Sequence, residues 1–347
     1  MKSLRVAAIA VAAGTFAVFS AQPASAQGYV PADTIHVGGT GQWDLIATDP
    51  PAHRAYVAHN VTIDVVDTAS KRPVGVIHTS GYTHGIAIVP SYGVGFATVG
   101  KSTASKAKPQ HEVDVFDLKT LKIVKRISVQ DDPDAITYDA VTHRIYVANA
   151  DPAVATVIDV PTKTIVKTVP LGGHPEFPIG DGLGHVFYNM NDTNKVVVFD
   201  SRKATIVKRF SLGACDGPTA IAYDAQARRL LIPCDNGKLV ILDATSGDVV
   251  ATLPIAKQPD GVAWDPATKT AFVATLYGKM TIVHQAGVKY SIVQTLALPL
   301  GSRTLGIDAA THKVYVPSSK FGPIPPGEKY PVPVPGAFGL LVVSLAG

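Results

Sequence analysis

The stretch AITYDAVTHRIYVAN, residues 135–149, decides the fold of this chain. It joins an apolar strand to an aspartate, a four-residue turn and a second strand with an aromatic-Val-Ala core. The pattern recurs at a spacing of about 43 residues, which is typical of one four-stranded blade in a repeat protein. The other copies lie at residues 45–59, 177–190, 220–234, 261–275, 304–318 and, more weakly, 85–99.

Two further strands follow in each unit. The third strand is an apolar run that ends in aspartate, as at Asp159 and Asp200, and such a run suits a strand buried on both faces. The fourth strand alternates and carries Lys and Arg, as in residues 165–169, which suits an outer edge. Seven units predict an all-β, seven-bladed β-propeller over residues 27–347. The seventh unit stops after its third strand, so we expect the strand at residues 34–37 to close the last blade.

The N-terminus has the pattern of a secretory signal peptide. Lys2 and Arg5 precede an apolar stretch, and Ala24-Ser25-Ala26 is a small-x-small cleavage site. We therefore expect residues 1–26 to be removed after Ala26 and the mature chain to be periplasmic or secreted, without a membrane span. Removal takes two of 31 basic residues and leaves 29 against 27 acidic ones, a balance of +2. That balance gives no argument for binding nucleic acid or anionic lipid.

Several tetrapeptides give this chain a family resemblance. Residues 56–59 (YVAH), 146–149 (YVAN) and 315–318 (YVPS) resemble the signature of YVTN-repeat, YncE-like propellers, and so do the phrases at 218–222 and 259–263. The resemblance covers essentially the whole mature chain and implies the propeller fold. It also implies single-stranded DNA binding for some relatives, but such binding needs aromatic residues along a basic groove. The function must therefore be argued from the site itself.

Of the two cysteines, Cys215 precedes the first strand of the fifth unit and Cys234 ends the second strand of the same unit. These strands are antiparallel neighbours, so the two positions should meet, and an oxidising compartment favours a disulfide. Four histidines, in contrast, each follow a repeat aspartate by four residues. Because Lys269 and Arg228 occupy the same phase, that position is expected to serve a turn rather than a metal. The histidines are His53, His143, His185 and His312.

The first residues of the innermost strands should converge at one mouth of the axial channel. Alignment of the units places seven residues there: Asp44, His84, Asp134, Glu176, Thr219, Asp260 and Arg303. One interpretation is that these side chains cap loop backbone and line a wet channel. The other is a ligand site made of Asp44, His84, Asp134, Glu176, Asp260 and Arg303. In that case Asp44, Asp134, Glu176 and Asp260 would hold a divalent cation such as calcium, since a cation relieves repulsion among carboxylates.

Two insertions, residues 100–112 and 322–337, lengthen loops on the same face, and we expect them to form a lid or a docking edge through His111, Lys329 and Tyr330. No nucleophile-elbow, zincin, phosphate-loop, haem or dinucleotide motif occurs in the sequence. The sequence therefore favours a binding or scaffold protein that recognises a small molecule, a metal or a protein at the channel mouth. The alternative is a metal-dependent, lactonase-like hydrolase with His84 as its base.

Overall fold

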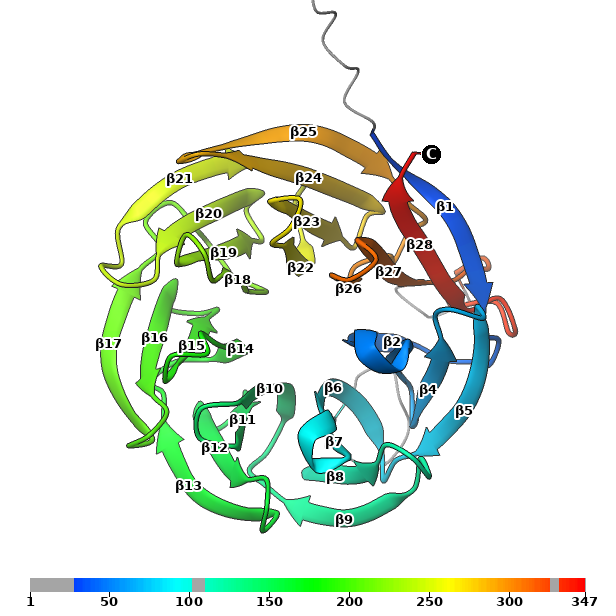
Figure 1. Cartoon of the computed structure of the whole chain (residues 1–347), viewed down its shortest axis with the longest axis horizontal. Helices are drawn as coiled ribbons and strands as arrows, with labels where there is room; N and C mark the ends of the chain where they lie inside the picture. Colours follow the sequence, from blue (N-terminus) through cyan, green and yellow to red (C-terminus); the bar gives the residue numbers. More distant parts are fainter. Residues whose placement is uncertain (1–27, 102–109, 325–330, 347) are drawn as a thin grey trace, which may run out of the picture.

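The computed structural model describes residues 28–101, 110–324 and 331–346. Within these ranges the chain forms seven four-stranded antiparallel sheets, arranged as blades around a central axis (Figure 1). The helical segments of the described residues are two 3-10 turns, Pro50–Ala52 and Pro90–Tyr92. The seven-bladed β-propeller predicted from the repeats is confirmed. The predicted signal peptide and the insertion residues Lys329 and Tyr330 lie outside the described residues.

The blades are numbered along the sequence, and in each one the strand nearest the axis comes first (Figure 1). Blade 1 consists of β2 (Trp43–Asp49), β3 (Arg54–His59), β4 (Thr62–Asp67) and β5 (Arg72–His78). Blade 2 consists of β6 (Tyr82–Val89), β7 (Val94–Gly100), β8 (Glu112–Asp117) and β9 (Ile123–Ser128). Blade 3 consists of β10 (Pro133–Asp139), β11 (Arg144–Asn149), β12 (Val154–Asp159) and β13 (Thr164–Pro170).

The remaining blades repeat this order. Blade 4 consists of β14 (Pro175–Gly180), β15 (His185–Met190), β16 (Lys195–Asp200) and β17 (Thr205–Ser211). Blade 5 consists of β18 (Ala222–Asp224), β19 (Arg229–Cys234), β20 (Lys238–Asp243) and β21 (Val249–Pro254). Blade 6 consists of β22 (Pro259–Asp265), β23 (Thr270–Thr275), β24 (Lys279–Ala286) and β25 (Lys289–Ala297). Blade 7 consists of β26 (Gly306–Asp308), β27 (Lys313–Ser318), β28 (Gly339–Leu345) and, from the other end of the chain, β1 (Tyr29–His36).

Burial along each blade follows the sequence pattern. In blade 3 the four residues 155–158 of β12 are buried, so this strand packs against blades on both of its faces. The outer strand β13 is exposed along most of its length and carries Lys167. Asp159, at the end of β12, accepts hydrogen bonds from the backbone N–H (3.0 Å) and the hydroxyl (2.6 Å) of Thr162. The recurrent aspartate thus fixes the turn between the third and fourth strands.

The turn between the first and second strands explains why histidine, lysine and arginine all occur four residues after the repeat aspartate. Most of these residues have a left-handed backbone with φ near +55°, which L residues adopt rarely. His312 Nδ1 lies 2.8 Å from Asp265 of the preceding blade, and His143 Nδ1 lies 3.1 Å from the Tyr138 hydroxyl. His185 differs, because Gly184 takes the positive φ and His185 Nδ1 contacts Asp181 at 2.9 Å. The turn positions therefore serve the local fold.

Closure of the ring joins the two ends of the described chain. β1 pairs antiparallel with β28 from Tyr29↔Leu345 to His36↔Gly339, and Figure 1 shows this strand on the outside of blade 7. The strand begins five residues earlier than the segment 34–37 suggested, because a register shift between Pro31 and Asp33 lets the pairing continue past the proline. The side-chain amide of Gln294 in blade 6 also bonds the backbone of Tyr29.

The predicted disulfide is confirmed. Cys215 and Cys234 are bonded, with Cα atoms 5.6 Å apart, and both residues are buried in a core shared by blades 4 and 5. Disulfides persist in oxidising environments, which agrees with a location outside the cytoplasm. None of the described helices has the length and apolar character needed to cross a membrane.

Candidate functional site

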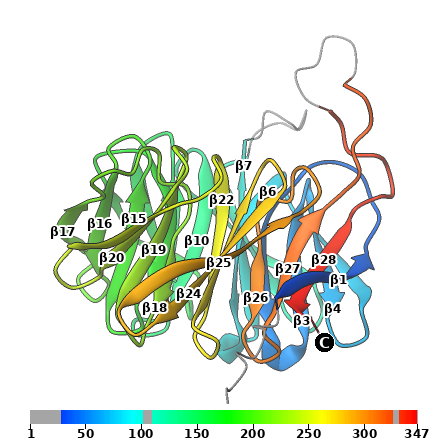
Figure 2. The same ribbon diagram turned by 90° about the horizontal axis from the view of Figure 1, so that it is seen from above.

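The channel mouth lies on the face where each innermost strand begins and each second strand ends. In Figure 2 this is the upper face, where β7 ends. The register of the first strand pair shifts at this end in blades 1, 2, 3, 4 and 6, between residue pairs such as Pro133 and Ile136. Each predicted mouth residue of these blades lies inside such an irregularity. A bulge of this kind re-aims a side chain, and the sequence alone gave no sign of it.

Five consecutive blades join their mouth residues into one chain of ion pairs. The Arg303 guanidinium of blade 7 donates to Asp260 of blade 6, and its Nη2 also lies 3.3 Å from Asp44 Oδ1 of blade 1. His84 of blade 2 contacts Asp44 at 2.7 Å, and the same nitrogen lies 3.6 Å from Asp134 of blade 3. Acid and base therefore alternate from blade 6 around to blade 3.

Both ring nitrogens of His84 face acceptors. Nδ1–H donates to Asp44 Oδ2, and Nε2–H donates to the carbonyl oxygen of Lys101 at 2.9 Å. Burial opposes the charge, but the hydrogen bond and the charge of Asp44 outweigh it and raise the pKa of His84 to about 9. Burial likewise works against the ionised form of Asp44, yet Arg303 and His84 hold the pKa of Asp44 below its ordinary value. An imidazolium in this position has no lone pair with which to accept a proton or bind a metal.

Two carboxyl groups at the mouth are poorly compensated. Burial, together with repulsion from Asp44, Asp132 and Asp260, raises the pKa of Asp134 to about 7, although His84 opposes the shift. Burial and the nearby carboxylates, with Asp134 and Asp260 first among them, raise the pKa of Glu176 to about 9. The ion-pair partner of Glu176 in the described part of the chain is His174, whose Nε2 lies 3.7 Å away. Glu176 is therefore a protonated acid at neutral pH.

The structure thus brings together most, but not all, of the predicted mouth set. Asp44, His84 and Asp134 present ligand atoms within 4.8 Å of one another, which is close enough for a metal ion. Glu176 and Asp260, which we also predicted as metal ligands, are not part of this group. Thr219 is buried, and its hydroxyl donates a long hydrogen bond (3.4 Å) to the Pro233 carbonyl.

An open pocket of about 330 Å³ lies over the ion-pair chain. Besides the predicted residues Asp44, His84, Asp134 and Arg303, it is lined by side chains that the repeat alignment did not single out: Gln42, Tyr82, Lys101, Asp132, Ala150 and His174. Most of these belong to loops beside the strands, where the repeat is least regular. Lys101 could have been noticed because it opens the first insertion.

The described ends of the two insertions pack on the rim of the mouth. Lys101 forms ion pairs with Asp151 and, at 3.5 Å, with Asp132, while His111 Nδ1 accepts from the Asp132 backbone N–H at 3.3 Å. At the second insertion, the orange and red segments beside residues 325–330 rise above this face in Figure 2. Phe321, the residue just before this insertion, packs its ring on Trp43 with centroids 5.8 Å apart. Both insertions are thus anchored next to the pocket.

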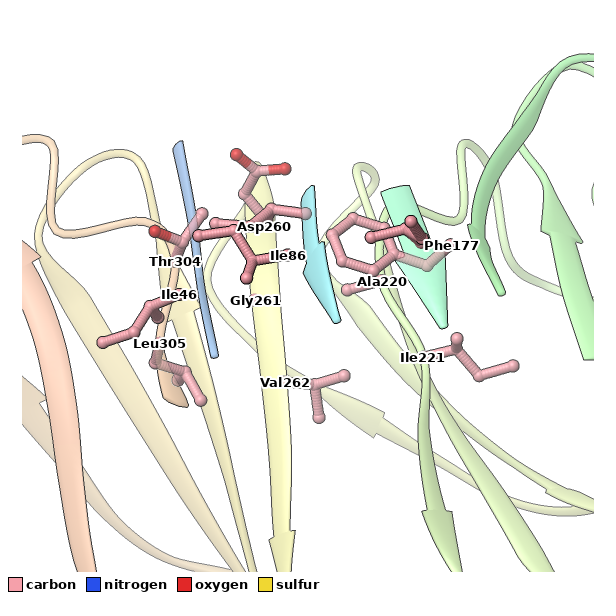
Figure 3. A pocket seen from close by; sticks show the side chains of 12 residues that line it. Ile46, Ile86, Phe177, Ala220, Ile221, Asp260, Gly261, Val262, Thr304 and Leu305 are labelled. Carbon is pink, nitrogen blue, oxygen red and sulfur yellow. The ribbon is translucent and has the colours of Figure 1, made fainter. Parts of the chain in front are cut away.

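Beneath the charged level, the axial channel contains a second cavity of about 140 Å³. Most of the side chains that line it are apolar, with Asp260 as the charged member and Thr304 as a hydroxyl, and backbone polar atoms also face the cavity. Figure 3 shows the Asp260 carboxylate at the rim and Ile221 and Val262 deeper in the channel. Phe177, which directly follows Glu176, also lines the cavity. A charged pocket and a cavity lined mostly by apolar side chains therefore lie next to each other on the axis.

The ring of sheets and its axial site define a seven-bladed β-propeller. Similar solved structures include a chain of Kuenenia stuttgartiensis hydrazine synthase, which has a TM-score of 0.70 and 16% identity and covers 83% of this chain and 96% of that one. The WD40 repeats of RRP9 have a TM-score of 0.75 and 10% identity, covering 93% of this chain and 99% of that one. U3-55K has the same TM-score and identity and covers 93% and 100%. The sequence matches no protein-family model and no curated protein. These likenesses show the fold alone.

Proposed function

We propose that this chain is an exported binding protein that holds a small polar ligand at the mouth of its channel. The observation that supports the proposal best is the 330 Å³ pocket over the ion-pair chain. A volume of this size is typical of small-molecule sites. The pocket offers both donors and acceptors, since Lys101 and His174 line it together with Asp132 and Asp134.

The charged residues beneath the pocket are suited to binding rather than catalysis. Alternating ion pairs from Asp260 to Asp134 hold their own side chains in fixed positions. His84 donates from both nitrogens, so it lacks the lone pair of a general base at neutral pH. Because the ion-paired side chains beneath the pocket are already held in place, they lose little conformational freedom when a ligand binds, which favours binding.

A metal-dependent hydrolase of the lactonase kind is the second candidate. The cluster of Asp44, His84 and Asp134, with ligand atoms within 4.8 Å, is the observation in its favour. A calcium ion prefers six to eight oxygen ligands, and an ion bound here would first have to displace the proton on His84 Nδ1. Elemental analysis of the purified protein, with and without Asp134→Asn, tests this candidate: a stoichiometric divalent ion that the variant loses would favour it.

Membership of the YVTN-repeat, YncE-like family is proposed from the tetrapeptide resemblance, and single-stranded DNA binding is the function that this resemblance would add. The mouth has more carboxyl groups than cations, which opposes a polyanion such as DNA. Export to the periplasm or the medium rests on the sequence pattern of residues 1–26, and the disulfide supports an oxidising compartment. A partner protein would bind at the same face, but the volume of the pocket fits a small molecule better.

Ligand-observed NMR against a set of small amines, carboxylic acids, sugars and nucleotides tests the proposal. Gln42→Trp places a large side chain in the pocket, and Gln226→Trp makes the same change in an exposed turn on the opposite face. We expect saturable binding that Gln42→Trp weakens at least tenfold and Gln226→Trp leaves unchanged. Compounds that bind equally to both variants, or a protein that binds none of them, would refute the mouth as a ligand site.

A further inference from the structure

We propose that the ligand is an organic cation whose charged nitrogen lies beside Glu176 and Asp260 and whose apolar part, about the size of a benzene ring, enters the axial cavity. This inference rests on the proposed function, extends its site from the 330 Å³ pocket to the neighbouring mouth residues of blades 4 and 6, and adds the chemical class of the ligand and its direction in the channel. The inference combines two features of the described residues: a break in the ring of ion pairs, and an axial cavity below the ring that is lined mostly by apolar side chains from all seven blades.

The break in charge alternation lies at blades 4 and 5. From Asp260 through Arg303, Asp44 and His84 to Asp134, each charge has an opposite neighbour. Blade 4 then contributes Glu176, which contacts His174 of its own blade at 3.7 Å but no mouth residue of a neighbouring blade in the ion pairs above, and blade 5 contributes the uncharged Thr219. The next charge around the ring is again an acid, Asp260. One positive charge placed between Asp134 and Asp260 would continue the alternation.

The cavity supplies the second, independent argument for an organic ligand. Its 140 Å³ are bounded by the side chains that follow the mouth residues along the innermost strands, among them Phe177, Ile221, Val262 and Leu305. Figure 3 shows Asp260 at its upper edge and apolar side chains below. An apolar cavity of about 150 Å³ in another protein stays dry and binds benzene, so this volume accommodates one ring or a short alkyl chain.

The same two features exclude other ligand chemistries. A calcium ion takes six to eight oxygen ligands, whereas the side chains that line the cavity below Asp260 are mostly apolar. A carboxylate or phosphate would meet the charges of Asp260 and Asp134 at the rim. A ligand with an ammonium group and an apolar part can place its charge at the level of the carboxylates and its carbon atoms in the cavity. The ring of Phe177, which lines the cavity, offers a further surface for a cation.

The proposed position makes binding release a proton. Glu176 is protonated in the free protein at pH 8, because its pKa lies at about 9. A cation beside it favours the ionised carboxylate, so the acid should lose its proton as the ligand binds. Asp134, with a pKa of about 7, is mostly ionised at that pH and contributes little to the proton count.

Calorimetric titration with benzylammonium at pH 8, in two buffers of different ionisation enthalpy, measures both affinity and proton release. We expect a Kd on the order of 1 mM or tighter, as for a small fragment. Benzoate and benzyl alcohol, which have the same ring without the positive charge, should bind at least tenfold more weakly. Wild-type protein should release a measurable fraction of a proton per ligand, with one proton as the upper limit, and Glu176→Gln should lose most of that release and bind more weakly.

Cavity-filling variants test the direction of the ligand. Val262→Phe fills the cavity and should weaken benzylammonium binding at least tenfold, and Val262→Met provides a smaller filling if the phenylalanine variant does not fold. Val124→Phe, the same change on the exposed outer strand β9, should have no effect. Unchanged affinity in a folded Val262 variant, or equal binding of benzoate, would overturn this inference. If other ligands still bind in a manner that Gln42→Trp blocks, the proposed function stands without it; if none does, both fall.

Discussion

Replacement of Glu176 by glutamine should stabilise the folded protein at neutral and alkaline pH. The side chain is only 21% exposed, lies among carboxylates and is protonated when the protein is folded. Glutamine has nearly the same shape and, like the protonated acid, carries no charge. The variant therefore keeps the folded state almost unchanged and removes the ionised form from the unfolded state.

The size of the effect follows from proton linkage. An unperturbed glutamate has a pKa of 4.5, whereas folded Glu176 has a pKa of about 9. Between these values the folded state binds one proton more than the unfolded state, so stability falls as the pH rises, by about 1.4 kcal/mol per pH unit. At pH 7, about 2.5 pH units above the lower value, Glu176→Gln should therefore gain at most about 3 kcal/mol. Near pH 4 both states are protonated and the gain should vanish.

Urea unfolding at pH 4, 7 and 8.5 measures this dependence directly. A gain of 1 to 3 kcal/mol would raise the Tm by about 2 °C per kcal/mol in a protein of this size. Glu112→Gln, the same chemical change at the start of β8, is the matched control and should show no comparable gain at pH 8.5. A stability difference between Glu176→Gln and wild type that is equal at all three pH values, or a loss at pH 8.5, would refute the assignment of Glu176 as a buried neutral acid.

Three further perturbations probe the ring and its mouth. His84→Gln should lower the free energy of unfolding, measured in urea, by about 3 kcal/mol at pH 6 and by little at pH 10. The raised pKa of His84 stabilises the folded state fully below about pH 6.5, and this stabilisation is lost as the pH passes about 9. A decrease that is the same at every pH would contradict the ion pair. Cys215→Ser should lower the free energy of unfolding by about 3 kcal/mol, and reduced wild-type protein should match the variant; no difference between oxidised and reduced protein would refute this stabilisation. Ile35→Ala truncates a buried side chain of the closing strand β1 and should lower the free energy of unfolding, measured by calorimetry, by about 2 to 4 kcal/mol. Val30→Ala, at an exposed position of the same strand, should lower it by less than about 1 kcal/mol. Equal decreases for the two variants would argue against closure of the ring by β1.

The repeat predicted the blades well because each of its signals is local. The aspartate at the end of β12 caps a turn within three residues, and the apolar run before it is buried on both faces wherever blades stack. The position of Asp134 at the mouth also followed from alignment with the other units. Its bulge did not, since Pro133 and Ile136 are paired out of step for reasons that depend on strand β11 and on the neighbouring blades.

At the site too, the sequence predicted which residues are present but not how they contact one another. The alignment selected Asp44, His84 and Arg303 as mouth residues, but it could not give their partners, because these come from blades that are about 40 to 260 residues apart in sequence. The sequence suggested that four acids would share a cation. In the structure, Arg303 and His84 already neutralise Asp44 and Asp260, and Glu176 is left with a proton.

The sequence by itself determined how many blades there are, which strand of each blade is innermost and how the cysteines pair, and it selected Asp44, His84, Asp134 and Arg303, which line the pocket at the mouth. Each of these properties either repeats with the sequence unit or depends on strands that are adjacent in the sequence, so it can be predicted from the sequence alone. Only the tertiary structure decided which charges pair across the mouth, where the alternation breaks and that an apolar cavity lies below Asp260. Those properties depend on distances between side chains of different blades, and closure of the ring sets those distances.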